Sequence, residues 1–322
     1  MMIPARVHFC WIGTSLPWAY VFAILSAAER SELPEIILHH TDVLEDGAEL
    51  RALRNASRVQ LSRIDPLACL AETGRRLGVG GELVVLYQGL DSPVMRTDVL
   101  RAAILYLQGG VYLDLDTVTT ASLLPLLDTP QFVGTEFIVW PHVVRASRSP
   151  IVWARHLILD LLRKILRRMP HGWRTFKRVE KFYFRGVNNA VMGAEANSSL
   201  LSEYLQAMLA VPPERRTQAY ALGPDLLQEV VDRYQQDDLI VEEPEVFYPL
   251  PPRISEQWFR IDRNARLDAV LSAKTRVVHW YASVRTKSRV ALIDPKYVQE
   301  HRERQLYSAL VCSCIRNLPD AA

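Results

Sequence analysis

The chain has 322 residues, and its 49% apolar content is enough to bury the core of one large domain. Its 38 basic and 36 acidic residues leave a net charge of +2, which gives no support for a nucleic-acid-binding protein. Four cysteines without C-x-x-C spacing exclude a disulfide-rich scaffold and argue against a zinc site, so reduced thiols are expected.

The first part of the chain alternates predicted strands with predicted helices. Apolar and amphipathic patterns predict strands at residues 3–12, 35–40 and 58–64, and helices at residues 17–30 and 51–56. Strands that alternate with helices form parallel βαβ units. The sequence therefore predicts an α/β, Rossmann-like, mostly parallel sheet flanked by helices, with ligands beyond the carboxyl ends of its strands.

The most informative segment is residues 96–120, RTDVLRAAILYLQGGVYLDLDTVTT. It predicts a short helix with Thr97 as N-cap and Gly109 at its carboxyl end, followed by a buried strand. Asp114 and Asp116 come next, and side chains two residues apart on an extended strand point to the same face. Adjacent carboxylates repel each other unless a cation lies between them, so the pair predicts a divalent metal with oxygen ligands.

The helix before this strand carries two charged residues on one face. Asp98 and Arg101 are three residues apart and so lie on the same face of the helix. An aspartate and an arginine in this arrangement can bind a sugar hydroxyl and a phosphate. Alone, the pair is typical of a surface ion pair that contributes little. The adjoining D-x-D motif favours the functional interpretation.

The rest of the chain is predicted to complete one domain that spans residues 1–322, with a basic helical insertion at residues 149–186. The further predicted strands are residues 132–137, 187–192, 246–248 and 276–280. The further predicted helices are residues 149–181, 197–210, 223–234 and 297–316.

Residues 155–181 within this insertion hold nine Lys or Arg and two acidic residues. Apolar side chains recur there at helical spacing, namely Leu157, Leu161, Ile165 and Met169. One interpretation is an amphipathic helix on an anionic membrane. The slightly favoured interpretation is a helix that docks on the domain by its apolar face and leaves a solvated basic face.

The segment 96–120 closely resembles the D-x-D core of a glycosyltransferase family. This family includes fungal initiating mannosyltransferases, lactosylceramide galactosyltransferase, bacterial capsular and lipopolysaccharide transferases and, more distantly, the clostridial glucosylating toxins. Its core runs roughly S-D-x-x-R-x-x-x-L-x-x-x-G-G-x-Y-x-D-x-D, and Thr97 replaces the serine here. The matching positions are Asp98, Arg101, Leu105, Gly109, Gly110, Tyr112, Asp114 and Asp116.

The resemblance implies a GT-A fold and an Mn²⁺- or Mg²⁺-dependent transferase. Such an enzyme moves a sugar, with retention of configuration, from a nucleotide-diphosphate sugar to a glycan, a lipid-linked acceptor or a protein. A UDP-sugar is the favoured donor, and a GDP-sugar is the alternative. No signal segment is evident before the first strand, so we expect a cytoplasmic enzyme that can contact the inner membrane face.

Shorter matches extend the resemblance. They are V-N-N-A-V-M-G at residues 187–193, A-L-G-P-D at residues 221–225, where Leu222 stands in place of threonine, and V-H-W-Y at residues 278–281. The implied catalytic residues are Asp98, Arg101, Asp114, Asp116 and Asn189. The implied donor contacts are Trp11, Gly13, Asp98, Arg101, Tyr112, Asp114, Asn188, Trp280 and Arg285. The implied metal ligands are Asp116, Asp114 and His279.

Structural roles remain open for some of these residues. Trp11 and His279 also suit a buried core, and the asparagine pair at residues 188–189 also suits a turn. His8 is expected to be a structural, hydrogen-bonded histidine, and Asp225 a residue at a helix amino terminus.

Two other functions fit parts of the sequence. D-L-D-T-V also matches the motif of haloacid-dehalogenase-like phosphatases, with Asp114 as nucleophile, but that chemistry needs a later acidic pair. Asp237 and Asp238 are the only candidates for such a pair. The other alternative is a non-catalytic protein that binds a nucleotide sugar.

Overall fold

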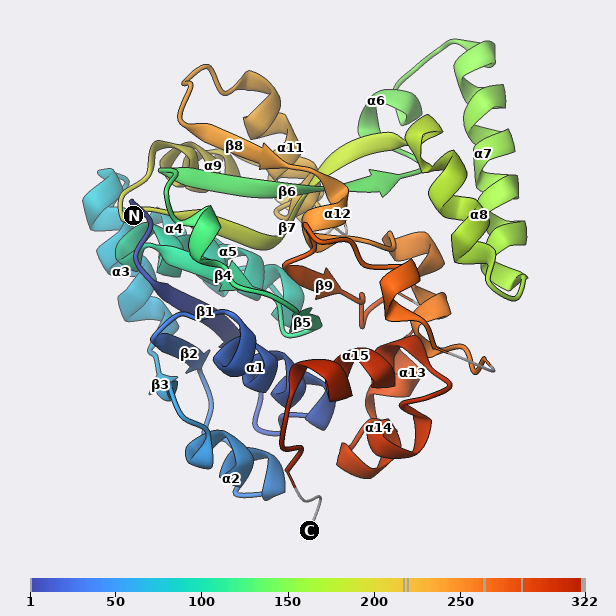
Figure 1. The fold of residues 1–322 in the computed structure, drawn as a ribbon. Helices are drawn as coiled ribbons and strands as arrows, with labels where there is room; N and C mark the ends of the chain where they lie inside the picture. The colour runs from blue at the N-terminus through green and yellow to red at the C-terminus, as the bar shows by residue number, and fades with distance from the viewer. Residues whose placement is uncertain (1, 217, 219, 263–264, 285, 320–322) are drawn as a thin grey trace.

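The computed structural model describes residues 2–216, 218, 220–262, 265–284 and 286–319. Its centre is a seven-stranded sheet of order β3-β2-β1-β4-β7-β6-β8 (Figure 1). These strands are β1 (Arg6–Trp11), β2 (Glu35–His40), β3 (Val59–Arg63), β4 (Gly110–Leu113), β6 (Gln131–Ile138), β7 (Phe184–Ala194) and β8 (Leu239–Glu242). Strand β7 is antiparallel to both of its neighbours, and the other neighbouring pairs are parallel. The predicted α/β, mostly parallel sheet is confirmed.

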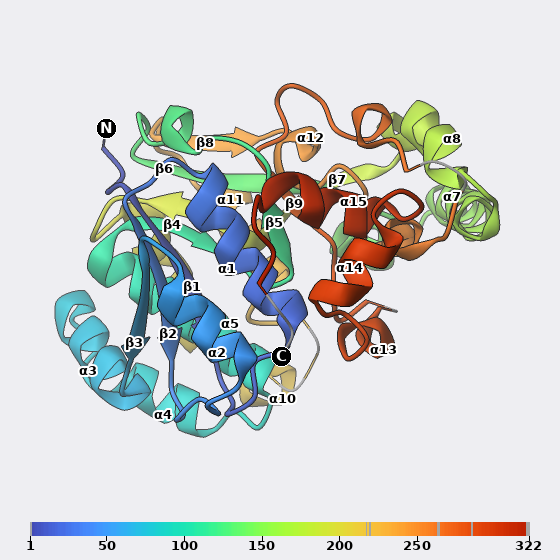
Figure 2. The same cartoon turned by 60° about the horizontal axis from the view of Figure 1, so that its bottom comes forward.

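Each face of the sheet carries its own hydrophobic core. On β4, Val111 and Leu113 enter one core and Tyr112 enters the other, because successive side chains of a strand point to opposite faces. The helices that contribute to the first core include α1 (Trp18–Arg30), α2 (Ala48–Asn55), α12 (Pro244–Phe247) and α15 (Leu306–Cys314). Those of the second core include α3 (Pro66–Leu77), α4 (Glu82–Gln88), α5 (Pro93–Gln108), α9 (Ser199–Ala210) and α11 (Pro224–Arg233). The two sets cover opposite faces of the sheet (Figures 1 and 2).

A small second sheet joins the middle of the chain to its carboxyl-terminal part. Strands β5 (Thr117–Thr119) and β9 (Val277–His279) pair in antiparallel fashion, with Thr117 opposite His279. The remaining short helices are α10 (Pro213–Arg216), α13 (Lys287–Val290) and α14 (Pro295–His301). Turns of 3₁₀ helix span Leu124–Leu126, Glu180–Phe182, Pro252–Phe259 and Leu267–Ala269.

The turn from α5 into β4 depends on two glycines. Gly109 and Gly110 have φ angles of 62° and 120°, which disfavour a side chain. A Cβ on Gly109 would lie 2.7 Å from the Ala196 nitrogen, and one on Gly110 would lie 2.9 Å from His8 Nε2. His8 bonds the Gly109 carbonyl at 2.8 Å and His39 at 2.9 Å, which confirms the structural role expected for it.

Several predicted boundaries are wrong for identifiable reasons. Helix α5 begins at Pro93 and has Ser92 as its N-cap, so the prediction of Thr97 as N-cap is wrong. The hydroxyl of Thr97 donates to the Pro93 carbonyl within the helix. The strand predicted at residues 246–248 overlaps helix α12, because Pro244 favours a helical first turn. The terminal helix divides into α14 and α15, because Gln305 pairs with Ile261 as an isolated β-bridge.

Three helices lie between β6 and β7, namely α6 (His142–Arg145), α7 (Pro150–Arg168) and α8 (Gly172–Val179). Helices α7 and α8 fall within the insertion predicted at residues 149–186, but residues 184–186 belong to β7. Both helices lie at the periphery of the molecule in both views (Figures 1 and 2).

Among the helices that the structure describes, none combines the length and hydropathy required to cross a bilayer.

Candidate active site

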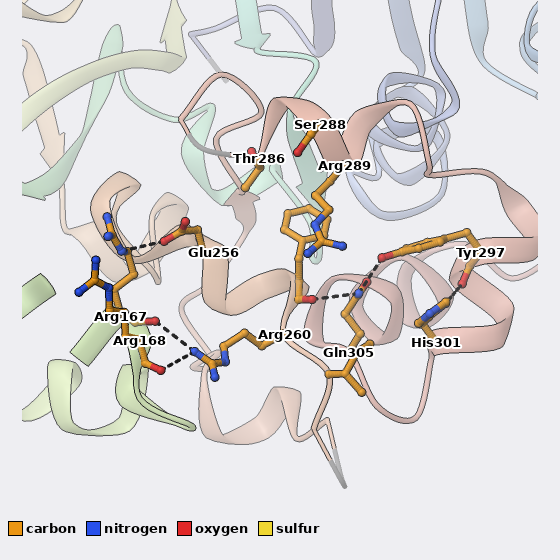
Figure 3. A pocket seen from close by; sticks show the side chains of 12 residues that line it. Arg167, Arg168, Glu256, Arg260, Thr286, Ser288, Arg289, Tyr297, His301 and Gln305 are labelled. Carbon is orange, nitrogen blue, oxygen red and sulfur yellow. Dashed lines mark hydrogen bonds and ion pairs between the residues drawn. The ribbon is translucent and has the colours of Figure 1, made fainter. Parts of the chain in front are cut away.

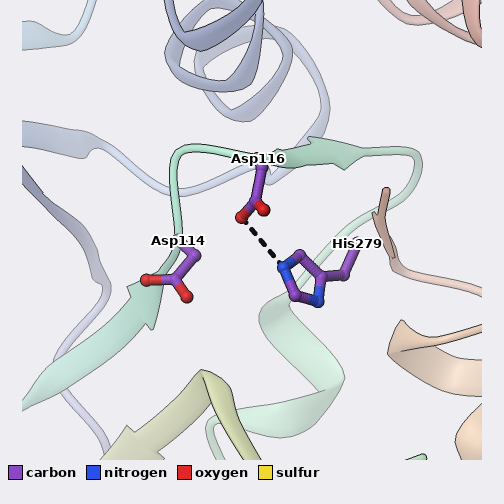
Figure 4. A group of neighbouring side chains, drawn as sticks. All are labelled: Asp114, Asp116 and His279. Carbon is purple, nitrogen blue, oxygen red and sulfur yellow. Dashed lines mark hydrogen bonds and ion pairs between the residues drawn. The ribbon is translucent and has the colours of Figure 1, made fainter. Parts of the chain in front are cut away.

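Asp114 and Asp116 lie where β4 ends and β5 begins (Figure 4). The amide of Asp114 donates to the Ala190 carbonyl at 2.8 Å, which continues the pairing of β4 with β7 past the end of the strand. Asp116 immediately precedes β5. Both side chains remain partly open to solvent, at 22% and 14% exposure. A ligand can therefore reach the two carboxylates from the same side.

His279 reaches this pair because β9 lies against β5. Its Nε2 lies 2.9 Å from Asp116 Oδ1, and the amide of Ala282 donates to Asp116 Oδ2 at 2.7 Å. One ligand atom from each of Asp114, Asp116 and His279 falls within 4.8 Å of the other two (Figure 4). Within the part of the chain that the structure describes, these three side chains form the candidate metal site, because at least three His, Cys, Asp or Glu ligands converge there.

Asp116 and His279 stabilise each other's charged form. Burial alone would raise the pKa of Asp116, but the charge and hydrogen bond of His279 and the Ala282 amide hold that pKa below its ordinary value. Burial lowers the pKa of His279, but the charge and hydrogen bond of Asp116, together with the charges of Asp114 and Glu136, outweigh burial and raise that pKa. Asp116 and His279 therefore form a charge-assisted hydrogen bond in this structure.

Arg101 holds Asp114 in place from behind. Its Nη1 donates to Asp114 Oδ2 at 3.1 Å, and its Nη2 forms an ion pair with Oδ1 at 3.1 Å. The Tyr112 hydroxyl donates to the same Oδ1 at 3.1 Å. Burial raises the pKa of Asp114 to about 6, opposed by Arg101 and assisted by the charge of Asp116. Arg101 is only 4% exposed, so it acts on a ligand through Asp114.

Asp98 and Asn189 complete the buried network around Arg101. Asp98 Oδ1 lies 3.2 Å from Arg101 Nη2 and accepts a 2.8 Å hydrogen bond from Asn189 Nδ2. The Asn189 carbonyl accepts from Arg101 Nη1 at 2.8 Å. Burial raises the pKa of Asp98, while Arg101 and Asn189 oppose the shift. The sequence motif thus corresponds to one hydrogen-bonded unit that links α5, β4 and β7.

Next to this unit is a polar cluster that the sequence patterns did not reveal. Buried Glu136 accepts hydrogen bonds from Asn188 Nδ2, at 2.9 Å, and from the Tyr281 hydroxyl. Tyr281 has a φ of 60°, which is strained for a bulky residue, and its ring lies 4.0 Å from that of His279. Glu136 lies in strand β6, which is mostly apolar and contains no recognisable motif. A charged residue within a buried strand is the one feature of the sequence that could have indicated a functional role for it.

Strand β1 and helix α1 bring an aromatic pair close to the acidic residues. Trp11 packs against Tyr20 with ring centroids 5.3 Å apart, and its Nε1 is buried without a hydrogen-bond partner among the described residues. Burial raises the pKa of Tyr20, and the charges of Asp116 and Asp114 raise it further. Gly13, with a φ of 136°, donates its amide to Asp42 Oδ2 at 2.9 Å. Tyr20 was not anticipated from the sequence.

One of the expected donor contacts, Trp280, packs away from the site. Trp280 is fully buried, with its ring 5.6 Å from Phe259 and 5.2 Å from Tyr307, so the interpretation that it covers a donor does not fit this structure. Its amide does donate to the Asp116 carbonyl at 3.0 Å, so it supports the site through the backbone. Arg285 lies outside the described residues.

A separate cavity of about 680 Å³ lies between α7 and the carboxyl-terminal helices (Figure 3). Its charged lining is basic except for Glu256, which pairs with Arg167 at 2.9 Å. Arg260 is held by the carbonyls of Arg167 and Arg168. Thr286 connects this cavity to the site, because its hydroxyl donates to the Tyr281 carbonyl.

The structure gives no support to the phosphatase alternative. Asp238 accepts hydrogen bonds from Gln131 and from Tyr234, each at 2.8 Å, at the beginning of β6. Neither Asp237 nor Asp238 belongs to the metal-holding group around Asp114. Both oxygens of Asp114 are held by Arg101, which does not suit a free nucleophile.

Comparison with known proteins finds one match to a family model, in the middle of the chain. Residues 81–133 match the family model described as the glycosyltransferase sugar-binding region containing DXD motif. The match includes α5, β4, β5 and both aspartates of the D-x-D. No curated protein sequence matches the chain.

Solved structures with a similar arrangement include three glycosyltransferases. The PaToxG glycosyltransferase is 13% identical, with a TM-score of 0.40 and coverage of 71% of this chain and 68% of that one. The UDP-bound glycosyltransferase domain of the YGT toxin is 10% identical, with a TM-score of 0.42 and coverage of 75% and 80%. Mouse xyloside xylosyltransferase 1 is 12% identical, with a TM-score of 0.42 and coverage of 86% and 98%.

TM-scores in this range support no inference about this chain. The likeness to glycosyltransferases therefore depends on the sequence match alone. That match covers the segment whose residues form the Asp98–Arg101–Asp114 network and supply two of the three side chains in the metal-holding group. Residues 81–133 of this chain therefore match the sugar-binding region, containing a DXD motif, of glycosyltransferases.

Proposed function

We propose that this glycosyltransferase depends on Mn²⁺, or on Mg²⁺, and transfers a sugar from a nucleotide-diphosphate sugar to a glycan, a glycolipid or a protein. A UDP-sugar is the favoured donor and a GDP-sugar the alternative. The observation that carries the proposal is the convergence of Asp114, Asp116 and His279 within 4.8 Å at the open end of the sheet.

The donor set suits a divalent metal. Two carboxylates and one imidazole fit Mn²⁺, which accepts both oxygen and nitrogen ligands, better than they fit Mg²⁺. Burial and the charge of Asp116 raise the pKa of Asp114 although Arg101 opposes the shift, and a further cation would stabilise the charged carboxylate. When bound, the metal supplies Lewis-acid stabilisation to the departing nucleoside diphosphate.

The buried residues behind the carboxylates position them. We assign Arg101 the task of fixing the Asp114 carboxylate, and Asp98 and Asn189 the task of fixing Arg101. Tyr112 supports the same carboxylate through its hydroxyl. Such an arrangement holds the ligand oxygens in one geometry before the metal and donor arrive.

The donor nucleotide is assigned to the side of the site formed by β1. The ring of Trp11, at the end of β1, is proposed as a stacking face for a base, and Gly13 lets a ligand approach the backbone. The side chain of Asn188 donates a hydrogen bond to Glu136. We assign Asn188 to the sugar end of the donor, because it lies in β7, the strand next to the one that ends at Asp114.

Retention of configuration is supported by the family resemblance. No carboxylate is assigned as a nucleophile, because Glu136 is buried and hydrogen-bonded to Asn188 and Tyr281. We also propose a cytoplasmic location, where nucleotide sugars are available, and the four unpaired cysteines agree with a reducing compartment.

The direct test is release of nucleoside diphosphate from a panel of UDP- and GDP-sugars, with Mn²⁺ or with EDTA. We expect slow release from one donor that requires metal and disappears in Asp116→Asn. Metal-independent release, or equal release by Asp116→Asn, would contradict the proposed site. Metal-dependent donor binding by calorimetry, without release and without transfer to any acceptor tested, would favour the non-catalytic alternative.

A further inference from the structure

Helix α7 is oriented opposite to the usual arrangement of a surface helix. A surface helix normally buries an apolar stripe and exposes a polar face. The buried residues of α7 are mostly polar, namely His156, Leu159, Asp160, Arg163 and Leu166. Its exposed large apolar residues, with their exposed fractions, are Ile151 (80%), Trp153 (39%), Leu157 (56%), Ile158 (67%), Leu161 (61%) and Ile165 (49%).

Hydrogen bonds fix this orientation. His156 Nδ1 bonds the Val139 carbonyl at 2.7 Å, and Arg163 Nη1 donates to the Arg253 carbonyl at 3.0 Å. Asp160 forms ion pairs with Arg163 and Lys164. The polar groups of the inner face therefore have specific partners, and rotation of the helix would leave them buried without these bonds.

The favoured expectation for this segment is therefore wrong. Leu157, Leu161, Ile165 and Met169 were expected to pack on the domain, but all four are exposed. Val143, before α7, and Phe182, after α8, are further exposed apolar side chains of the insertion, at 59% and 50% exposure. Contiguous exposed apolar side chains of this kind mark a surface that another body covers. We call this surface the α7 face.

The charge around the α7 face indicates what covers it. Residues 142–182 contain 11 Lys or Arg and two acidic residues, a net +9 in a chain whose total is +2, so the rest of the chain carries −7. Both acids are paired, Asp160 with Arg163 and Lys164, and Glu180 with Lys177. The exposed basic side chains are Arg145, Arg148, Arg155, Lys164, Arg168, Arg174, Arg178 and Lys181.

Exposed apolar side chains within a basic surface match an anionic membrane. The apolar residues enter the boundary between headgroups and acyl chains, and the Lys and Arg side chains meet anionic headgroups. A second copy of this chain fits less well, because the two surfaces would each carry the same large positive charge. The peripheral position of α7 and α8 leaves the face accessible to a planar surface (Figures 1 and 2).

We propose that the α7 face docks this protein on the surface of an anionic phospholipid bilayer, with α7 lying in the plane of the membrane. The docking needs neither metal nor donor. Where it is combined with the proposed function, and only then, it implies an acceptor carried on a lipid.

Vesicle sedimentation of the full chain tests the proposal. The probes are vesicles of phosphatidylcholine alone and vesicles that also contain phosphatidylglycerol, at low and at high salt. We expect sedimentation with the anionic vesicles and its loss at high salt, because screening weakens the attraction. Hydrogen exchange should show vesicle-dependent protection of α7.

Matched variants locate the binding surface. Combined Ile158→Ser, Leu161→Ser and Ile165→Ser should lower the binding constant at least about tenfold. The control, Val43→Ser with Val85→Ser and Val94→Ser, changes three side chains of similar exposure elsewhere (65%, 69% and 64%) and should have no effect.

A second set of variants tests the charge. Arg174→Gln with Arg178→Gln should weaken binding about fivefold for each charge removed. The control, Lys296→Gln with Arg302→Gln, lies outside the insertion and should leave binding unchanged.

Three results would overturn the proposal. They are no sedimentation with anionic vesicles at low salt, equal losses in the α7 and control variants, and a dimer in sedimentation velocity that the serine variant dissociates. The last would assign the face to a second copy. Asp116→Asn should still bind vesicles, so the two proposals can fail independently. Vesicle binding without donor turnover would contradict the proposed function alone. Donor turnover without vesicle binding would contradict the docking alone.

Discussion

Arg101 and Asp114 are joined by a two-pronged contact in which each Nη nitrogen of the arginine lies 3.1 Å from a different oxygen of the carboxylate. The arginine comes from a helix and the aspartate from the end of the next strand, so the glycine turn between them sets the geometry of the contact. A planar guanidinium can form this contact and an ammonium group cannot.

Replacement of Arg101 by lysine should therefore reduce activity about 10- to 100-fold, the usual effect of removing a partner that orients a metal ligand. Donor turnover at saturating Mn²⁺ measures the effect. Arg76→Lys is the control, because Arg76 pairs with Glu72 on an exposed helix surface. Unchanged turnover in Arg101→Lys would show that Asp114 needs no fixed orientation.

His279→Ala should raise the Mn²⁺ concentration needed for half-maximal turnover about 10- to 100-fold, because one of three candidate ligands is lost. The metal activation curve is the measurement. His301→Ala, on α14 and away from the acidic pair, should give the wild-type curve. If both variants gave the wild-type curve, His279 would be a structural residue.

Tyr281→Phe should destabilise the fold by about 1–3 kcal/mol, because buried Glu136 loses a hydrogen-bond donor. The double variant with Glu136→Gln should recover part of that loss, since the neutral amide needs less stabilisation. Urea unfolding of the two single variants and the double variant gives the coupling energy. Strictly additive losses would contradict a direct role for this hydrogen bond.

Acid should weaken the fold through His8 and His39. Burial lowers the pKa of His8 from 6.5 to about 4, and burial with the neighbouring His8 lowers that of His39 to about 3. Below pH 6.5 both histidines bind protons in the unfolded chain but remain neutral in the folded chain. The free energy of unfolding is therefore highest above pH 6.5 and decreases progressively as the pH falls toward the folded-state pKa values. Between about pH 7.5 and 5.5 the expected loss is about 1.4 kcal/mol for each histidine.

Urea unfolding at the two pH values tests this. His39→Gln keeps a side chain that can hydrogen-bond to His8 but does not titrate, so it should lose less stability than the wild type over the same interval. Equal losses in both proteins would assign the acid sensitivity to other groups.

Local patterns predicted the first half of the fold and the core of the site. The strands at residues 35–40 and 58–64 were clear because short apolar runs are bounded by polar or turn-forming residues. The adjoining D-x-D motif and the family resemblance favoured a functional role for Asp98 and Arg101, and the structure joins both to Asp114 in one network. Helices α3 and α4 were missed, because α3 buries few apolar residues and α4, with 7 residues, is too short to show a helical period.

Contacts between distant segments were beyond local patterns. The pairing of β5 with β9 brings His279 to Asp116 across 163 positions, and no local feature of the chain encodes this register. Only the family resemblance pointed to His279, whereas Glu136 and Tyr20 had no such signal. For α7, helical periodicity located an apolar stripe correctly, but periodicity does not tell which face the protein buries.

The insertion that carries the α7 face leaves the sheet at Ile138 and returns at Phe184, and these two residues are register partners on adjacent antiparallel strands. Antiparallel neighbours can also be joined by a tight turn. The segment between these two residues therefore starts and finishes at neighbouring positions of the sheet, and it adds Leu166, Trp173 and Phe176 to the hydrophobic core. The side chains to which we assign the chemistry and the surface to which we assign membrane docking thus lie on separate parts of the chain.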